Sequence, residues 1–220
     1  MARCLLYYIT DRIQFPGDEN ARRRRLLDKI AEGAHSGVDL IQLREKDLSA
    51  RELEVLALSA VRIVRQNSAQ TKLLINSRTD IALAVGADGV HLRSDDLSPR
   101  IVRDIWSQRR SPAAAPDDTR CLIAVSCHSH VEVREAAAAG ADFAVFAPVF
   151  EKTASPGTAP LGLHALQQAC QAAIPVLALG GVTETNAQSC LAAGASGIAA
   201  IRLFQHNDIN RVAGCIRTSL

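Results

Sequence analysis

Short runs of hydrophobic residues alternate along the chain with longer segments that have a helical pattern. Four of these runs occupy Leu5–Ile9, Leu73–Ile75, Leu122–Val125 and Val176–Leu179. Four more begin after a repeated phrase, in which a helical segment ends at Gly37, Gly86, Gly140 or Gly194. These glycines are 49, 54 and 54 residues apart, and glycine at such a position suits the left-handed end of a helix. The pattern therefore predicts eight short strands separated by helices.

Hydrophobic strands that alternate with helices are typical of a parallel sheet covered on both faces. Eight of them in 220 residues predict an α/β fold, a closed (β/α)₈ TIM barrel that forms a single domain over residues 1–220. An open doubly wound sheet is the alternative, but no GxGxxG sequence follows the first strand to support it. The segment Ser107–Thr119, which contains two prolines and three consecutive alanines, predicts a surface loop before the fifth strand.

Composition and charge indicate a globular protein without a nucleic-acid or membrane partner. With 48% hydrophobic residues the chain can bury a large core, and a net charge of +2 gives no reason to expect a nucleic-acid partner. The basic run Arg22–Arg25 falls inside the expected first helix and is interpreted as a solvated face. Six scattered cysteines without metal-binding spacing favour reduced core residues. No run is long enough to span a membrane and no signal peptide is visible, so we expect a cytoplasmic protein that acts on small molecules.

Polar residues follow nearly every expected strand. The run Val38–Ile41 leads directly into Gln42, Arg44, Glu45 and Lys46, and arginine and lysine together suit a phosphorylated ligand. The other strand ends hold Thr10–Asp11, Asn76–Arg78, His91 with Asp95 and Asp96, Ser126 with His128, the segment 148–158 with Lys152 and Thr153, Gly180–Gly181, and Ile201–Arg202. Barrel enzymes place their chemistry at this edge, so the ring of polar strand ends predicts an active site.

Each part of this ring also has a simpler interpretation. Gly180–Gly181 could be a tight turn, although its place on the seventh strand matches the phosphate-binding turn of many barrels. The loop with Lys152 and Thr153 could close over an anion or could be solvated.

The two aspartates and the two histidines of the ring also have more than one interpretation. Asp95 and Asp96 carry the oxygen ligands that Mg²⁺ takes, but they could instead cap the next helix. His91 and His128 are of a type that is more often hydrogen-bonded than catalytic. His128 lies close to Ser126 in sequence, without a visible acidic partner for a triad.

Several stretches carry a family resemblance. They are Tyr8–Asp11, Gln42–Lys46, Ile75–Arg78, Ala87–Leu92, Val125–His128, Ala147–Phe150, Pro160–Gly162, Ala178–Val182 and Ala193–Ala199. In this order they resemble the thiamine phosphate synthase family over nearly the whole chain. The resemblance implies a Mg²⁺-dependent transferase, which joins hydroxymethylpyrimidine diphosphate to thiazole phosphate, or to its carboxylated precursor, and releases pyrophosphate. It also implies a homodimer, since family members are often dimers.

The resemblance implies roles for individual residues. The pyrimidine diphosphate would be held by Gln42, Arg44, Lys46 and Asn76. Ser126 would contact the diphosphate, and Asp96 would bind the metal. The thiazole phosphate would be held by Gly180, Gly181 and the amides near Ile201 and Arg202. Lys152 and Thr153 are further substrate-binding candidates, and Lys46, Ser126 and His128 are candidates for catalysis.

Three departures from the family pattern keep alternatives open. Ser77 stands where the family usually has a metal-binding aspartate, Lys152 precedes Thr153 instead of following it, and Arg202 replaces a serine. TenI-type thiazole tautomerases share the barrel, need no metal and transfer a proton, for which His128 is a candidate base. A noncatalytic protein that binds thiazole phosphate or thiamine phosphate is the third alternative. The complete Gln42–Lys46 stretch favours the synthase, because it would have little purpose without a diphosphate.

Overall fold

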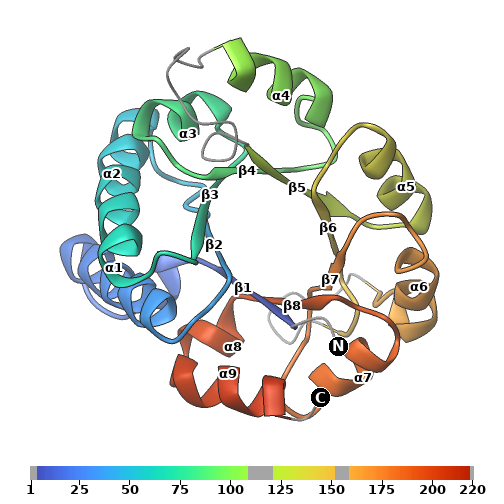
Figure 1. The fold of residues 1–220 in the computed structure, drawn as a ribbon. Helices are drawn as coiled ribbons and strands as arrows, with labels where there is room; N and C mark the ends of the chain where they lie inside the picture. The colour runs from blue at the N-terminus through green and yellow to red at the C-terminus, as the bar shows by residue number, and fades with distance from the viewer. Residues whose placement is uncertain (1–3, 109–120, 152–158, 219–220) are drawn as a thin grey trace.

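The chain forms a closed barrel of eight parallel strands surrounded by helices (Figure 1). The computed structural model describes residues 4–108, 121–151 and 159–218. The strands are β1 (Leu5–Ile9), β2 (Leu40–Leu43), β3 (Lys72–Asn76), β4 (Gly89–Leu92), β5 (Leu122–Cys127), β6 (Phe143–Phe146), β7 (Val176–Ala178) and β8 (Gly197–Ala200). The helices are η1 (Arg12–Gln14), α1 (Glu19–His35), α2 (Ala50–Asn67), α3 (Thr79–Val85), α4 (Pro99–Gln108), α5 (His130–Ala138), α6 (Gly162–Ala169), α7 (Ala187–Ala192), α8 (Arg202–Gln205) and α9 (Ile209–Thr218). The predicted barrel is confirmed.

Strand order in space follows strand order in sequence, and β8 pairs with β1 to close the sheet, with Leu5 opposite Gly197. The four repeated glycines all have positive φ, at 73°, 66°, 89° and 98° in chain order, as expected for left-handed helix ends. One prediction needs correction. Helix α4 continues to Gln108, so Ser107 is helical; the rest of the expected loop lies outside the described residues.

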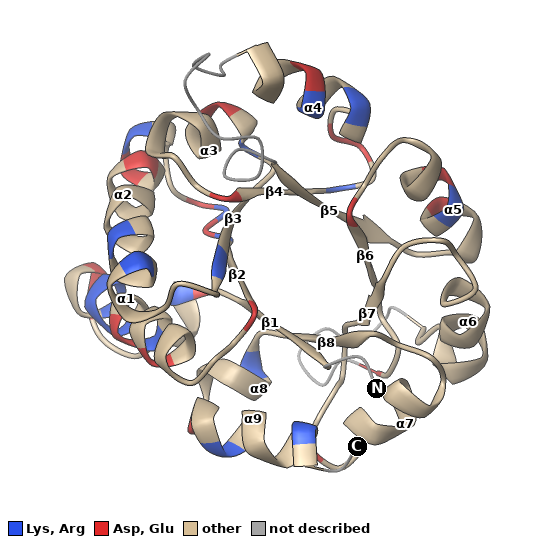
Figure 2. Cartoon of the chain, in the orientation of Figure 1, with Lys and Arg blue, Asp and Glu red and all other residues tan. Residues whose placement is uncertain are grey.

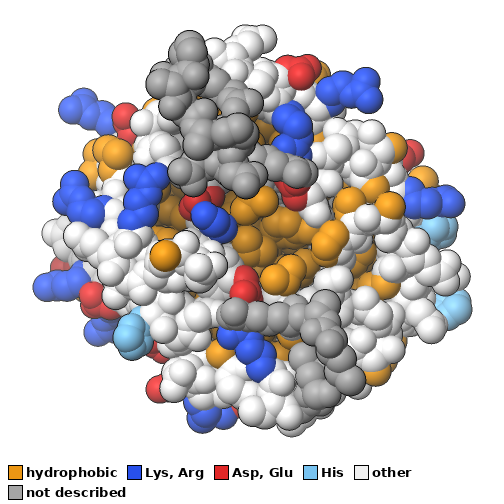
Figure 3. Space-filling model, viewed as in Figure 1, with side chains coloured by type: hydrophobic (Ala, Val, Ile, Leu, Met, Phe, Trp, Pro, Cys, Tyr) orange, Lys and Arg blue, Asp and Glu red, His pale blue; other side chains and the backbone are white. Residues whose placement is uncertain are grey.

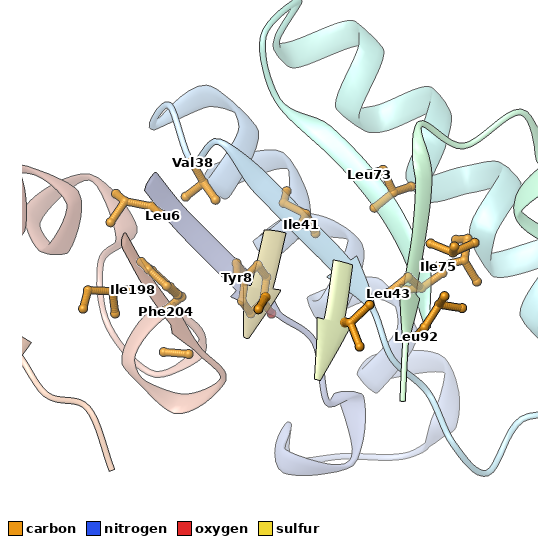
Figure 4. Packing of buried hydrophobic residues seen from close by; sticks show 14 of the residues in the cluster. Leu6, Tyr8, Val38, Ile41, Leu43, Leu73, Ile75, Leu92, Ile198 and Phe204 are labelled. Atoms are coloured by element: carbon orange, nitrogen blue, oxygen red, sulfur yellow. The ribbon is translucent and has the colours of Figure 1, made fainter. Parts of the chain in front are cut away.

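Side chains along each strand alternate between the barrel interior and the helix layer. The interior is packed by Tyr7, Ile9, Leu40, Leu74, Ala124, Phe143, Val145, Leu177 and Ala199. The larger outer core lies between strands and helices, and Figure 4 shows part of it, with Tyr8 beside Phe204. Each large side chain buried here contributes roughly 1.5–3 kcal/mol. Because both layers are packed, the strand ends stand on a rigid base.

The surface carries mixed charge. Lys and Arg residues occur on α1, α2, α4, α5, α8 and α9, whereas α3, α6 and α7 carry none (Figure 2). Within the basic run of α1, Arg23 pairs with Glu19 and Glu52. Four of the six cysteines are buried, as the sequence suggested, but Cys215 is exposed. None of the helices in the described ranges is long and apolar enough to cross a membrane.

Candidate active site

The carboxyl ends of the strands meet around one cavity of about 940 Å³. It is lined by ten of the predicted site residues: Gln42, Arg44, Lys46, Asn76, Ser126, His128, Gly180, Gly181, Ile201 and Arg202. Figure 3 shows the other end of the barrel, where the strands begin; there hydrophobic side chains occupy the middle of the face and charged side chains lie around them. Lys152 and Thr153 lie outside the described residues. The roles assigned to these residues stay predictions, but their convergence makes a common site possible.

The cavity is lined by Gln42 of β2 and by Arg44 and Lys46, which follow the strand. Glu45 faces the other way and is buried, with 5% of its surface exposed. Its carboxylate accepts hydrogen bonds from Thr10 Oγ1 (2.6 Å) and from the backbone N–H of Arg12 (3.0 Å). The Thr10 hydroxyl oxygen in turn accepts from the backbone N–H of Arg44 (3.0 Å). These bonds fix the β2 end to the β1 end.

The Arg12 side chain completes this anchor. Only 4% of this side chain is exposed to solvent, and it contacts Glu45, Glu19 and Asp47. Two parallel hydrogen bonds of 2.6 and 2.7 Å join it to Asp47, and they hold the pKa of that carboxyl below its usual value. Burial raises the pKa of Glu45, against the opposing effects of Thr10 and Arg12. Arg12 was not among the predicted site residues. Its only signal in the sequence was a charge three positions after the hydrophobic run Leu5–Ile9.

A second set of contacts runs through the barrel interior. Gln42 Nε2 lies 3.1 Å from the Tyr7 hydroxyl, which lies 3.0 Å from His91 Nδ1. His91 Nε2 lies 2.7 Å from Ser126 Oγ. Burial, together with the positive charge of Arg44, lowers the pKa of His91 to about 3, against the opposing effect of Asp96. The ring is therefore neutral near pH 7, in keeping with the simpler interpretation of His91.

The acids after β4 are engaged by their own loop. Asp96 accepts a hydrogen bond from the backbone N–H of Arg93 (2.8 Å), and Asp95 accepts one from the Arg93 guanidinium (3.0 Å). Asp95 lines the cavity, whereas Asp96 is not among the described residues that line it. Ser77, in place of the family's aspartate, has φ of 59° and accepts a hydrogen bond from the Asn76 amide (3.2 Å).

A magnesium site at this loop would be small. Within the described part of the chain, no group of three or more His, Cys, Asp or Glu side chains is arranged to hold a metal. Mg²⁺ commonly binds one or two carboxylates and completes its shell with water and substrate phosphates. Asp95 and Asp96 therefore fit the ion as a partial site, which a phosphorylated ligand would complete.

His128 is exposed and lines the cavity, and its imidazole bonds to the backbone of the next strand end. Its Nδ1 lies 2.7 Å from the carbonyl oxygen of Ala147. Since a carbonyl only accepts, Nδ1 carries the proton of the neutral ring and Nε2 keeps its lone pair. His128 therefore has the tautomer that a base acting through Nε2 requires.

The opposite wall is built from glycine and hydrophobic residues. Gly181 has φ of 64°, and a Cβ placed on it would lie 2.5 Å from the carbonyl oxygen of Glu151 and 2.7 Å from Phe150 Cβ. Only glycine fits this approach. No acceptor in the described segments takes a hydrogen bond from the N–H of Gly181 or Val182. The turn is thus more than a tight connection, because it presents amide donors that a phosphate could accept.

The rim of this (β/α)₈ barrel combines arginine and lysine with a glycine turn whose amides meet no acceptor within the described segments. These features define a class of protein, the barrel enzymes that bind phosphorylated small molecules. Within this class the chain belongs to the thiamine monophosphate synthase family, whose sequence profile matches residues 6–204.

Individual relatives agree with this family. A Caldanaerobacter subterraneus protein named thiamine-phosphate synthase is 36% identical over 206 residues, which cover 93% of this chain and 87% of that one. A Geobacter sulfurreducens protein, whose name gives the same activity as unproven, is 41% identical and covers 89% and 84%. The structure of thiamine phosphate pyrophosphorylase from Pyrococcus furiosus superposes with a TM-score of 0.76 at 29% identity, over 97% and 94% of the two chains.

Proposed function

We propose that this protein is a thiamine phosphate synthase, which condenses hydroxymethylpyrimidine diphosphate with thiazole phosphate or carboxythiazole phosphate. One observation carries the proposal. The Gln42–Lys46 face and the Gly180–Gly181 turn line the same cavity, so two phosphorylated substrates could meet there. Family membership and the synthase relatives support the same activity.

The reaction breaks the bond between the pyrimidine methylene carbon and the diphosphate oxygen, whose electron pair leaves with pyrophosphate. The thiazole nitrogen then supplies the electron pair of the new carbon–nitrogen bond. Arg44 and Lys46 would balance the charge that develops on the leaving diphosphate, while Gln42 and Asn76 orient the pyrimidine. The amides of Gly181 and Val182, with Ile201 and Arg202 beside them, would hold the thiazole phosphate. Asp96, with Asp95 adjacent, would hold Mg²⁺, which adds positive charge at the leaving group.

A thiazole tautomerase is the second candidate, and the tautomer of His128 favours it. The unprotonated Nε2 beside the cavity could take a proton from carboxythiazole phosphate. The partial acidic site after β4 is also compatible with a reaction that needs no metal.

One experiment separates the candidates. The purified protein is incubated with both substrates and Mg²⁺, and thiamine phosphate and pyrophosphate are measured with and without EDTA. Metal-dependent formation of both products supports the synthase. Isomerisation of carboxythiazole phosphate without metal supports the tautomerase instead. Binding without either turnover would contradict both and identify a noncatalytic protein. A homodimer and a cytoplasmic location stay predictions, which sedimentation and cell fractionation would test.

A further inference from the structure

Gln42, Tyr7, His91 and Ser126 form a continuous chain of hydrogen bonds between four strands, at 3.1, 3.0 and 2.7 Å. Its two ends, Gln42 and Ser126, line the cavity together with His91. Its middle is closed to solvent, because Tyr7 is 0% and His91 3% exposed. Polar groups buried this deeply need defined partners, so the proton positions along the chain are not arbitrary.

The donors set the direction of the chain. The Gln42 amide nitrogen can only donate, so the Tyr7 oxygen accepts from it. The single Tyr7 O–H then donates its hydrogen bond to His91 Nδ1. A neutral imidazole that accepts at Nδ1 carries its proton at Nε2, and this N–H donates to Ser126 Oγ.

We propose that Tyr7 and His91 are positioning residues, which hold the Ser126 hydroxyl as a hydrogen-bond donor into the cavity. Ser126 Oγ accepts a hydrogen bond from the His91 Nε2–H, and its own O–H is therefore free to donate to the ligand. An acceptor such as a phosphate oxygen fits this arrangement, and Arg44 and Lys46 on the same cavity favour an anion. That the ligand is a diphosphate rests on the proposed function; the orientation of the serine does not.

The surroundings of His91 support a neutral ring. Burial lowers the pKa of His91, and so does the Arg44 guanidinium, while Asp96 acts in the opposite direction. If the Gln42 amide were turned over, every link would reverse. Ser126 would then donate to His91 and would present only lone pairs to an anion, which would weaken binding.

The tautomer of His91 shows in which of the two directions the hydrogen bonds between Gln42 and Ser126 run. We would record histidine ¹⁵N–¹H correlation spectra of the full chain at pH 7, with the His91 signals assigned by comparison with His91→Gln. A neutral ring protonated at Nε2 supports the proposal. A ring protonated at Nδ1, or at both nitrogens, overturns it. This measurement needs no ligand to bind.

A thermodynamic cycle tests the coupling to the ligand site. With inorganic pyrophosphate as the probe, calorimetry should give about tenfold weaker binding for Ser126→Ala, the loss expected for one hydrogen bond to a charged group. Tyr7→Phe should weaken binding about threefold to tenfold, and adding it to Ser126→Ala should cause no further loss. Independent, additive losses would overturn the positioning role.

Tyr8→Phe is the matched control, because it removes the neighbouring hydroxyl that donates to Gln205 on the outside of the barrel. It should leave pyrophosphate binding unchanged, and a loss equal to that of Tyr7→Phe would also overturn the role. If the unaltered protein does not bind pyrophosphate, the proposed function fails. The tautomer of His91 would still show the direction in which the hydrogen bonds from Gln42 to Ser126 run.

Discussion

The guanidinium of Arg12 lies 3.2 Å from the carboxylate of Glu45, and the two side chains are only 4% and 1% exposed. This buried ion pair connects the segment after β1 to the end of β2. Since Gln42, Arg44 and Lys46 stand on that end, the pair positions the cations of the cavity without lining it.

Glu45→Ala should destabilise the protein by about 3 kcal/mol, because removal of one partner leaves a buried charge incompletely paired. Urea denaturation would measure the change. Glu54→Ala, on the exposed face of α2, is the control and should change the free energy of unfolding by less than about 0.5 kcal/mol. Equal effects for the two variants would contradict the anchoring role of Glu45.

Gly181→Ala should lose both stability and phosphate binding. The substitution combines a positive φ with a Cβ 2.5 Å from the Glu151 carbonyl oxygen, so the turn must move. We expect at least tenfold weaker binding of inorganic phosphate by calorimetry, together with a lower Tm. Gly214→Ala is the control, because nothing lies within 4 Å of its added Cβ in helix α9. That variant should be about 0.5–1 kcal/mol more stable, and unchanged phosphate binding by Gly181→Ala would argue against the amide turn.

Acid should destabilise the protein through His91. Its pKa is about 3 in the folded state and about 6.5 in the unfolded chain, so the unfolded chain binds more protons between these values. The His91 contribution is thus complete above about pH 6.5 and is lost as pH falls toward 3. Urea denaturation at pH 7, 6, 5 and 4 should show a steeper loss for the unaltered protein than for His91→Gln. Parallel curves would mean that His91 titrates normally.

The barrel could be predicted because each strand carries its own signal, a short hydrophobic run, which in four cases follows a glycine at a helix end. Gln42, Arg44 and Lys46 could also be predicted locally, because polar residues follow directly on the hydrophobic run Val38–Ile41. The Arg12–Glu45 pair and the contact between Tyr7 and His91 could not. They join residues 33 and 84 positions apart, and nothing in the local pattern distinguishes them from other polar or aromatic residues.

The loop after β4, with Asp95 and Asp96, could be predicted only in part. Both aspartates could be identified as oxygen ligands, but their pairing with Arg93 depends on how the loop folds back on itself. Asp96 was chosen as the metal ligand through the family resemblance, whereas Asp95 is the one that lines the cavity. The choice between them stays a prediction.

Asp96→Asn tests that choice. The amide oxygen can still accept from the Arg93 backbone N–H, so the loop should keep its shape while the charge is lost. If Asp96 holds Mg²⁺ with the diphosphate, the Mg²⁺ concentration for half-maximal turnover should rise at least about tenfold. Asp95→Asn is the matched comparison, and a larger shift for Asp95→Asn would move the metal site to that residue.

His128→Asn separates proton transfer from condensation. The asparagine amide can still donate to the Ala147 carbonyl, but it offers no basic nitrogen in place of Nε2. Any isomerisation of carboxythiazole phosphate that uses His128 as its base should fall by about 10²–10⁴-fold. Formation of thiamine phosphate requires no proton abstraction by His128 and should fall by less than about tenfold, a loss that contact with the substrate alone can explain. Both rates would be measured on the same protein preparation, with exposed His164→Gln as the control. If condensation fell as far as isomerisation, His128 would have to act in the synthase reaction itself, and the two activities would share one catalytic group.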